Sequence, residues 1–262
     1  MTVYIFTGPT LLPEDGKKEF DAIYLSPAAQ GDVYLAAREQ PIAIGIIDGY
    51  FERVPSVAHK EVLWAMAQGV HVFGCSSMGA LRAAELAAFG MEGVGEIYQA
   101  FASGLLEADD EVAVAHASAE DGYRALSEAM VNIRATLAAA TTAGVISTAT
   151  ATALEAIAKE LFYPDRCYPI ILSRARQAGI DTRELSALAA FLPAGRVDQK
   201  RADAVAMLHT MREWLAGVPE PKRVRYHFER TDAWEYIRAT SDQARAVAPD
   251  LEPMRADQDT RC

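Results

Sequence analysis

The stretch "VHVFGCSSMGALRAAELAAFGMEGVGE" (residues 70–96) decides the fold, because an apolar β-branched run gives way to a helical pattern within a few residues. β-branched runs favour strands, whereas alanine and leucine at helical spacing favour a helix. The turn between the two holds a cysteine, two serines and a glycine. The stretch therefore predicts a strand, a tight turn and a helix, with Ser76 and Ser77 at the turn.

Three earlier segments repeat the strand pattern. They are "TVYIFT" (2–7), "AIYL" (22–25) and "IAIGIID" (42–48). Helical segments lie between the later strands, and such alternation implies right-handed crossovers and a largely parallel sheet. Near-continuous apolar runs fit strands that are buried on both faces. The sequence therefore predicts an α/β fold with an N-terminal, largely parallel sheet and crossover helices.

Beyond residue 76 the chain is rich in alanine, leucine and charged residues at helical spacing. The expected helices cover 78–89, 93–103, 119–143, 147–162, 167–178, 181–191 and 198–216. "EVAVAH" (111–116) fits either a strand or a buried helix turn. We expect an α/β core over 1–165, a helix-rich C-terminal extension over 166–245, and a flexible tail over 246–262 that has few apolar residues to bury.

Composition and charge exclude several classes of function. The net charge of −11 argues against a nucleic-acid partner, because phosphate binding needs a basic surface. Three cysteines without C-x-x-C spacing and five scattered histidines predict neither a zinc site nor a disulfide framework. No signal-peptide pattern and no long apolar run is present, so we expect a cytoplasmic protein without a membrane partner. "TGPT" (7–10) lacks the phosphate-loop and dinucleotide patterns, so we expect no cofactor.

Three unusual loops are predicted to meet at one edge of the sheet. In parallel α/β sheets the ligand crevice lies outside the carboxyl ends of the strands, where the strand order reverses. "TGPT" (7–10), "DGYFE" (48–52) and "GCSSMG" (74–79) follow three of the predicted strands. Asp48 could there bind a ligand or orient a base, or it could be a turn-forming residue.

The two serines admit two interpretations. A strand, a sharp turn and a helix are the context of a nucleophile elbow, although "GCSSMG" has one residue too many for G-x-S-x-G. Serine is also a preferred helix N-cap. A nucleophile needs a base, and His59 and Lys60 in the expected crossover helix are better placed than His71 inside the strand. Lys60 could equally be an exposed helix lysine that pairs with a glutamate.

An acidic run follows the predicted site region in the sequence. Asp109, Asp110 and Glu111 could bind a cation or a basic partner surface. The more ordinary interpretation is a solvated helix start, where carboxylates are favoured by the helix dipole.

Taken together, the motifs resemble a known family. Residues 48–116, with "HKE", "SSMGALRAAEL", "GMEGVG" and "DDEVAV" in this order, are similar to the core of TfuA-like proteins, which are encoded beside YcaO enzymes. "FTGPTLL" near the start and "SEAMVNIRATLAAATTAG" (127–144) also resemble the family. The segment after about residue 165 matches no family motif, and Cys75 and Ser76 stand where alanine-like residues are expected.

The resemblance implies a role in peptide backbone thioamidation, a post-translational modification in which sulfur replaces an amide oxygen. It implies three partners: a YcaO enzyme, the precursor peptide bound through YcaO, and a ThiS-like sulfur carrier whose thiocarboxylated C-terminus is hydrolysed to release sulfide. It assigns the nucleophile to Ser77 and the base to Lys60, and leaves Ser76 as a cap or supporting donor.

The anionic thiocarboxylate requires further groups at the site. We expect Arg82 or His59 to offset its charge, and amides of Thr7 and Gly8, or of 74–79 including Met78 and Gly79, to form an oxyanion hole. The alternative is a non-catalytic adaptor that recruits peptide and carrier to YcaO. The alanine-rich helical half supports that alternative, because it suits interfaces better than chemistry.

Overall fold

The computed structural model describes residues 1–52 and 54–247. The chain divides into two compact units: Met1–Glu107 together with the segment from Arg201 onward form the first, and Ala108–Lys200 form the second. The expected boundary at residue 165 thus falls inside the second unit, because the chain returns to the first unit at Arg201. Of the tail expected to be flexible, residues 248–262 lie outside the described residues.

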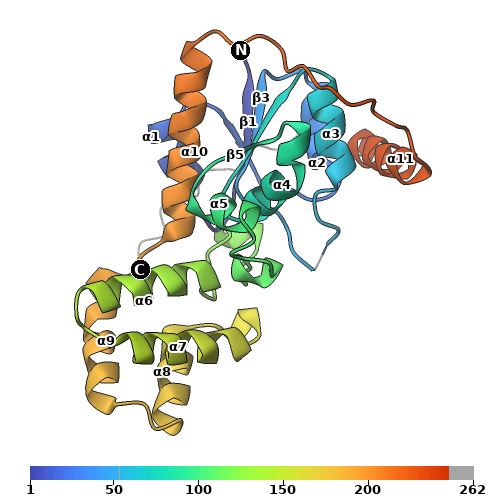
Figure 1. Cartoon of the computed structure of the whole chain (residues 1–262). Coiled ribbons are helices and arrows are strands. Elements are labelled where there is room, and N and C mark those ends of the chain that lie inside the picture. The colour runs from blue at the N-terminus through green and yellow to red at the C-terminus, as the bar shows by residue number, and fades with distance from the viewer. Residues whose placement is uncertain (53, 248–262) are drawn as a thin grey trace. The chain divides into compact units, whose positions relative to one another are not determined.

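The first unit contains a five-stranded parallel sheet in the order β2-β1-β3-β4-β5 (Figure 1). The strands are β1 (Val3–Phe6), β2 (Ile23–Leu25), β3 (Ala43–Ile46), β4 (His71–Gly74) and β5 (Glu92–Gly93). This confirms the α/β class and all four predicted strands. The fifth strand was missed because its two residues are too few to show a pattern.

Side chains of the strands alternate between two apolar layers. On one face Phe6, Ile44 and Val72 pack against α2 (Asp32–Arg38), α3 (His59–Ala67) and α4 (Met78–Leu86). On the other face Ile5, Ile47 and Phe73 pack against α10 (Gln199–Ala216), near α1 (Pro13–Glu19). Strands buried on both faces explain the near-continuous apolar runs in the sequence.

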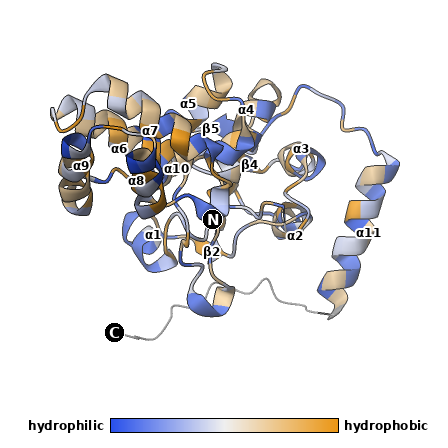
Figure 2. Ribbon diagram, turned by 90° about the horizontal axis from the view of Figure 1, so that it is seen from below, coloured by the Kyte–Doolittle hydropathy of each residue, from blue (hydrophilic) through white to orange (hydrophobic). Residues whose placement is uncertain are grey.

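Three further helical elements complete the described part of the first unit. It comprises α5 (Glu96–Ala102), a 3-10 turn at Ala87–Phe89 and, beyond α10, the helix α11 (Asp232–Val247). Figure 2 shows hydrophobic and hydrophilic residues mixed along α11, whose Trp234 and Ile237 are buried. Trp234 stacks on Trp64 of α3 with ring centroids 5.7 Å apart.

The second unit is helical and has its own apolar core. Its helices are α6 (Met130–Thr142), α7 (Thr148–Glu160), α8 (Tyr168–Gln177) and α9 (Thr182–Gly195), with 3-10 turns at Asp109–Glu111, Ala119–Asp121 and Tyr163–Asp165. Ile133, Leu137, Leu154 and Leu188 lie in the shared core.

Two sequence expectations for this unit need correction. The helix predicted over 119–143 begins only at Met130, because residues 119–129 form turns with positive φ at Gly122 and Tyr123. The segment 111–116 forms neither a strand nor an α-helix: Glu111 ends the 3-10 turn, and His116 makes an isolated bridge to Ala125. In the described part of the chain, every helix is too short or too polar for a transmembrane segment.

Candidate active site

The candidate site lies where the strand order reverses, between β1 and β3. Here the loops that follow β1, β3 and β4 leave the carboxyl edge of the sheet, as the sequence predicts. The loop after β2 joins them, because the Ala28 amide donates to the Asp48 carbonyl at 3.0 Å and the Tyr50 amide donates to the Ala28 carbonyl at 3.0 Å. Backbone hydrogen bonds therefore join the loop after β2 to the loop after β3 at this edge of the sheet.

Two glycines allow the turn between β4 and α4 to be tight. A Cβ at Gly79 would lie 1.7 Å from the carbonyl oxygen of Ile46, and one at Gly74 would lie 2.1 Å from the carbonyl oxygen of Gly79. The backbone of the first turn of α4 thus contacts the backbone at the ends of β3 and β4, with no side chain between them. Close helix–strand approach of this kind is what the glycines of a nucleophile elbow provide.

Ser76 occupies a strained position in the turn. Its φ is +62°, and the Ser77 amide donates to the Cys75 carbonyl at 2.7 Å, which closes a three-residue γ-turn around Ser76. The side chain is fully buried, and its hydroxyl donates to the Cys75 thiol at 3.2 Å. A left-handed conformation is unfavourable for serine, so the fold holds strain here.

Ser77 stands at the N-cap position of α4 but does not cap it with its side chain. Its φ of −124° and ψ of −126° lie outside the strand and helix regions, and its hydroxyl makes no capping hydrogen bond. The side chain is 8% exposed, whereas Ser76 is 0% exposed. Ser77 instead starts the helix through its carbonyl, which accepts from the Ala80 amide at 2.9 Å. The side-chain cap interpretation therefore does not describe this serine.

Several amides expected in an oxyanion hole are already engaged. The Thr7 amide donates to the Leu25 carbonyl at 2.9 Å, and the Gly8 amide donates to Asp48 at 2.9 Å. The Gly79 amide donates to the Ile47 carbonyl at 3.4 Å. Met78 is the first residue of α4, and the first amides of a helix have no acceptor inside it. The Met78 amide is therefore the best-placed donor at this turn.

Asp48 organises the loop after β1. Its buried carboxylate accepts from the Gly8 amide at 2.9 Å, the Thr10 amide at 3.0 Å and the Thr10 hydroxyl at 2.6 Å. The residue thus joins two loops of the candidate site. These contacts give Asp48 a structural task; the sequence had left open a ligand-binding or base-orienting carboxylate and a turn-forming residue.

Lys60 lies on the outer side of α3. Its ammonium donates to the Glu229 carbonyl at 2.8 Å and lies 5.0 Å from the centroid of the Phe228 ring. Val62, two residues further on, is fully buried against the sheet, and two residues turn a helix by about 200°. Lys60 therefore points away from the sheet, and the structure does not bring its ammonium to Ser77.

Glu61, the third residue of "HKE", was not predicted as a site residue but is fully buried. Its carboxylate accepts from the amides of Gly31 at 3.0 Å, Val33 at 3.1 Å and Tyr34 at 3.3 Å, at the start of α2. It also accepts from Ala58 at 2.7 Å, before α3. Burial raises the pKa of Glu61 to about 7, although these amides oppose the shift. The cap position, residue 58, is an alanine rather than the Ser, Thr, Asp or Asn of a capping box, so the sequence carries no such signal for Glu61.

His59 and Arg82, expected to offset substrate charge, converge on one glutamate. His59 Nε2 lies 2.7 Å from Glu85, and Arg82 donates to the same carboxylate at 2.7 Å. Arg82 also donates to the Val57 carbonyl at 2.7 Å and to the Ser56 hydroxyl at 3.2 Å. These contacts connect the loop before α3 to α4. The carboxylate of Glu85 already balances the positive charge of Arg82.

In the second unit, the acidic run forms an ion-pair network rather than a solvated helix start. Asp110 pairs with Lys159 and Arg166, and Glu111 pairs with Arg134 and Lys159. Burial alone would raise the pKa of Asp110, but hydrogen bonds from Arg166 and Lys159 hold it below its usual value. In the part of the chain that the structure describes, no group of three histidine, cysteine or acidic side chains is placed to hold a metal ion.

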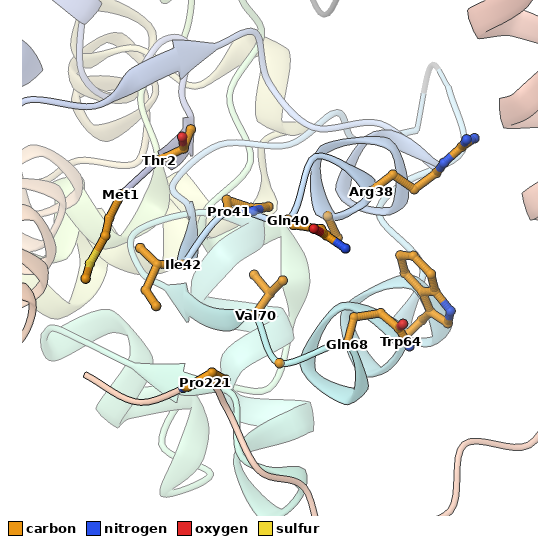
Figure 3. Close-up of a pocket in the computed structure, with 12 residues that line it drawn as sticks. Met1, Thr2, Arg38, Gln40, Pro41, Ile42, Trp64, Gln68, Val70 and Pro221 are labelled. Atoms are coloured by element: carbon orange, nitrogen blue, oxygen red, sulfur yellow. The ribbon is translucent and has the colours of Figure 1, made fainter. Parts of the chain in front are cut away.

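The first unit also contains a pocket of about 460 Å³ (Figure 3). Thr2, Ile42 and Val70 line it, and each comes just before a strand. The pocket therefore opens at the amino edge of the sheet, opposite the edge where parallel α/β folds bind ligands. Polar contributions come from Arg38 and Gln68. The pocket is therefore separate from the candidate site, which lies at the carboxyl edge.

The geometry agrees with a comparison against protein families. Residues 48–167 match the family model described as TfuA-like protein. The chain carries a TfuA-like region. This confirms the resemblance drawn from the motifs, and the TfuA-like match includes the β4–α4 turn, the start of α3 and the ion-pair network. The chain has no significant match among curated proteins.

Proposed function

We propose that this TfuA-like chain hydrolyses the thiocarboxylated C-terminus of a ThiS-like sulfur carrier and so supplies sulfide to a YcaO enzyme. TfuA-like proteins are associated with YcaO enzymes in peptide backbone thioamidation, and the family match supports that context.

One observation carries the hydrolytic step. The β4–α4 turn places two adjacent, buried serines at the carboxyl edge of the sheet, on a strained γ-turn that leads directly into a helix N-terminus. A nucleophile on a sharp strand-to-helix turn and a partial positive charge at the helix start are the elements that acyl transfer needs.

The reaction balances without a cofactor. A serine oxygen forms a bond to the thiocarboxylate carbon, the carbon–sulfur bond breaks, and sulfur leaves as hydrosulfide with the serine proton. Water then adds to the acyl-serine ester, and the carrier carboxylate and one proton leave. The α4 N-terminus, with the Met78 amide, stabilises the oxyanion in both steps.

Lys60 is the base that the resemblance implies. To act on Ser77 it must leave the Glu229 carbonyl and the Phe228 ring, and it must cross from the outer side of α3. Because the departing sulfur can take the serine proton, acylation does not require this movement. We therefore propose hydrolysis by the serine turn, with Lys60 outside the acylation step.

A specific observation favours a second candidate, the non-catalytic adaptor. Lys60 anchors the segment that includes Phe228 and Glu229, and it does not contact the serines. The helical unit Ala108–Lys200 has an apolar core of its own, which suits a recruiting module. In this alternative the TfuA-like chain raises the affinity of YcaO for its peptide and releases no sulfide.

The test removes both hydroxyls at once. Purified protein receives a thiocarboxylated carrier, and sulfide is measured for the wild type and for the double variant Ser76→Ala/Ser77→Ala. We expect release by the wild type and loss of about a thousandfold or more in the double variant. Ser241→Ala, which removes another buried hydroxyl in the same unit, is the matched control. If the wild type strengthens the binding of YcaO to its peptide but releases no sulfide, the adaptor is correct.

A further inference from the structure

The helical unit Ala108–Lys200 contains a pocket of about 360 Å³ between α8 and α9 (Figure 1). We propose that this pocket binds an extended acidic segment of a partner protein. An apolar side chain of the segment enters the pocket, and the carboxylates on either side of it pair with Arg176 and Arg196. The inference goes beyond the proposed hydrolysis, because every residue that lines the pocket belongs to the helical unit.

The floor of the pocket is apolar. Tyr168, Leu172 and Arg176 follow one another at intervals of four residues, so they lie on one side of α8. Leu192 lines the pocket from α9. Leu172, Leu192 and the ring of Tyr168 are buried in the apolar core of the unit. The floor therefore suits an apolar side chain of a partner.

The two arginines stand at opposite ends of this floor. Arg196, which follows α9, lies over the ring of Tyr168 at the start of α8, with its guanidinium carbon 4.9 Å from the ring centroid. Arg176 lies near the other end of α8, eight residues beyond Tyr168. Because a helix rises 1.5 Å per residue, the two cations are about 12 Å apart along α8.

Both guanidinium groups are available to a partner. In the part of the chain that the structure describes, neither forms an ion pair or a hydrogen bond. Burial raises the pKa of Glu128, and the charge of Arg196 opposes that shift, so this carboxylate lies near Arg196 without pairing with it. The side chains of Arg174 and Arg183 are equally unpaired, but they do not line the pocket. The apolar floor between them is what distinguishes Arg176 and Arg196.

Pro193 favours an extended occupant over a helical one. Proline has no N–H, so the carbonyl of Ala189, four residues earlier in α9, lacks its usual helical donor. Both residues line the pocket. An extended segment offers N–H groups to this carbonyl, whereas the N–H groups inside a helix are already bonded.

The spacing of the arginines defines the pattern of the partner segment. In an extended chain, alternate side chains point to the same side, and residues four apart are about 13 Å from each other. An acidic, an apolar and an acidic residue at every second position therefore match the two arginines and the floor between them. Because the whole chain carries a net charge of −11, it does not attract acidic segments in general, and binding depends on this local pair.

The test uses the full chain and the peptide Ser-Glu-Ser-Leu-Ser-Glu-Ser with blocked ends, in isothermal titration calorimetry. We expect a Kd below about 1 mM. Arg176→Ala/Arg196→Ala should weaken binding by about tenfold or more, because two charge-assisted hydrogen-bonding groups are lost. Arg174→Ala, an exposed arginine of the same helix outside the pocket, should change it by less than about twofold. Peptides with glutamine for both glutamates, or serine for leucine, should each bind about tenfold more weakly.

Two further variants separate binding from a structural role. Arg176→Glu should weaken binding of the acidic peptide and restore binding of a peptide in which lysine replaces one of the glutamates. Ala189→Trp fills the pocket from an exposed position, keeps both arginines, and should weaken binding by about tenfold or more.

Three results would overturn the proposal. They are no binding of the acidic peptide by the wild type, equal binding by Arg176→Ala/Arg196→Ala, and tighter binding of a single-stranded oligonucleotide of equal charge. Sulfide release is measured in a separate experiment, so this proposal and the proposed hydrolysis can fail independently.

Discussion

Two strand-to-helix connections at the same sheet edge differ in how their sequence motifs are used. Between β4 and α4, three residues make a strained turn, and both glycines of "GCSSMG" are needed for backbone contact. Between β3 and α3, a loop of twelve residues leads to "HKE". There Lys60 faces outward, and the buried carboxylate of Glu61 accepts hydrogen bonds from four backbone amides.

The difference teaches that neighbouring motifs need not form one catalytic pair. The β4–α4 turn presents hydroxyls, whereas the start of α3 supplies Glu61 as an internal support and Lys60 as an anchor for the segment at 228–229. In the proposed reaction "SSMG" supplies the nucleophile, whereas the contacts of "HKE" are structural.

The largest expected effect is at Gly79. Gly79→Ala places a Cβ 1.7 Å from the Ile46 carbonyl oxygen, so the first turn of α4 must move away from the sheet. We expect the free energy of unfolding to fall by more than about 4 kcal/mol. Gly104→Ala, which meets no atom within 4 Å and has a φ of +74°, is the control and should cost only about 1–2 kcal/mol. Chemical denaturation measures both, and equal losses would show that close packing at the turn is unimportant.

Removal of the Glu61 carboxylate is expected to have the next largest effect. Glu61→Ala leaves four backbone amides at the starts of α2 and α3 without their acceptor. We expect a loss of about 3 kcal/mol in the free energy of unfolding. Glu107→Ala, at an exposed position of the same unit, should change it by less than about 0.5 kcal/mol. A loss at Glu61 no larger than at Glu107 would contradict the supporting role.

The same residue predicts a pH dependence. Because burial raises the pKa of Glu61 from 4.5 to about 7 in the folded state, the folded protein binds the proton more tightly than the unfolded chain does. The stabilisation from protonation is present below about pH 4.5 and is lost as the pH rises through about 7. Glutamine does not titrate, so Glu61→Gln lacks the stabilisation from protonation. The variant should therefore be less destabilised relative to the wild type at pH 8 than at pH 5. Denaturation at both pH values tests this, and a larger destabilisation at pH 8 would reverse the sign.

The smallest expected effect is at Lys60. Lys60→Ala removes one hydrogen bond to a carbonyl and one cation–π contact, both partly exposed, and should cost less than about 1 kcal/mol. Sulfide release should stay within about threefold of the wild type. Phe228→Ala removes the aromatic ring of the same cation–π contact and is the matched variant for Lys60→Ala. A loss of release of a hundredfold or more for Lys60→Ala alone would restore the Ser/Lys pair.

Much of the fold follows from short-range patterns in the sequence. The apolar runs at 2–7 and 42–48 predict central strands, and "GCSSMG" predicts the turn because its glycines and serines lie between a strand pattern and a helix pattern. The return of the chain at Arg201 could not be predicted in this way, because it depends on α10 packing against β3 from far along the chain.

The site was predictable in part, for the same reason. The outward direction of Lys60 could be read from the helical phase, since Val62, Ala65 and Met66 mark the buried side of α3. Its partner could not, because Glu229 lies 169 residues away in a segment without a clear pattern. Nor does any pattern show which serine takes a positive φ, because the γ-turn results from close packing of α4 on the strands.

The most direct test of the central claim is sulfide release from a thiocarboxylated carrier by the wild type and by Ser76→Ala/Ser77→Ala. We expect the wild type to release sulfide and the double variant to lose about a thousandfold or more of that release, while circular dichroism shows that its fold is retained. Equal release by the two proteins would show that the β4–α4 turn is not the active site.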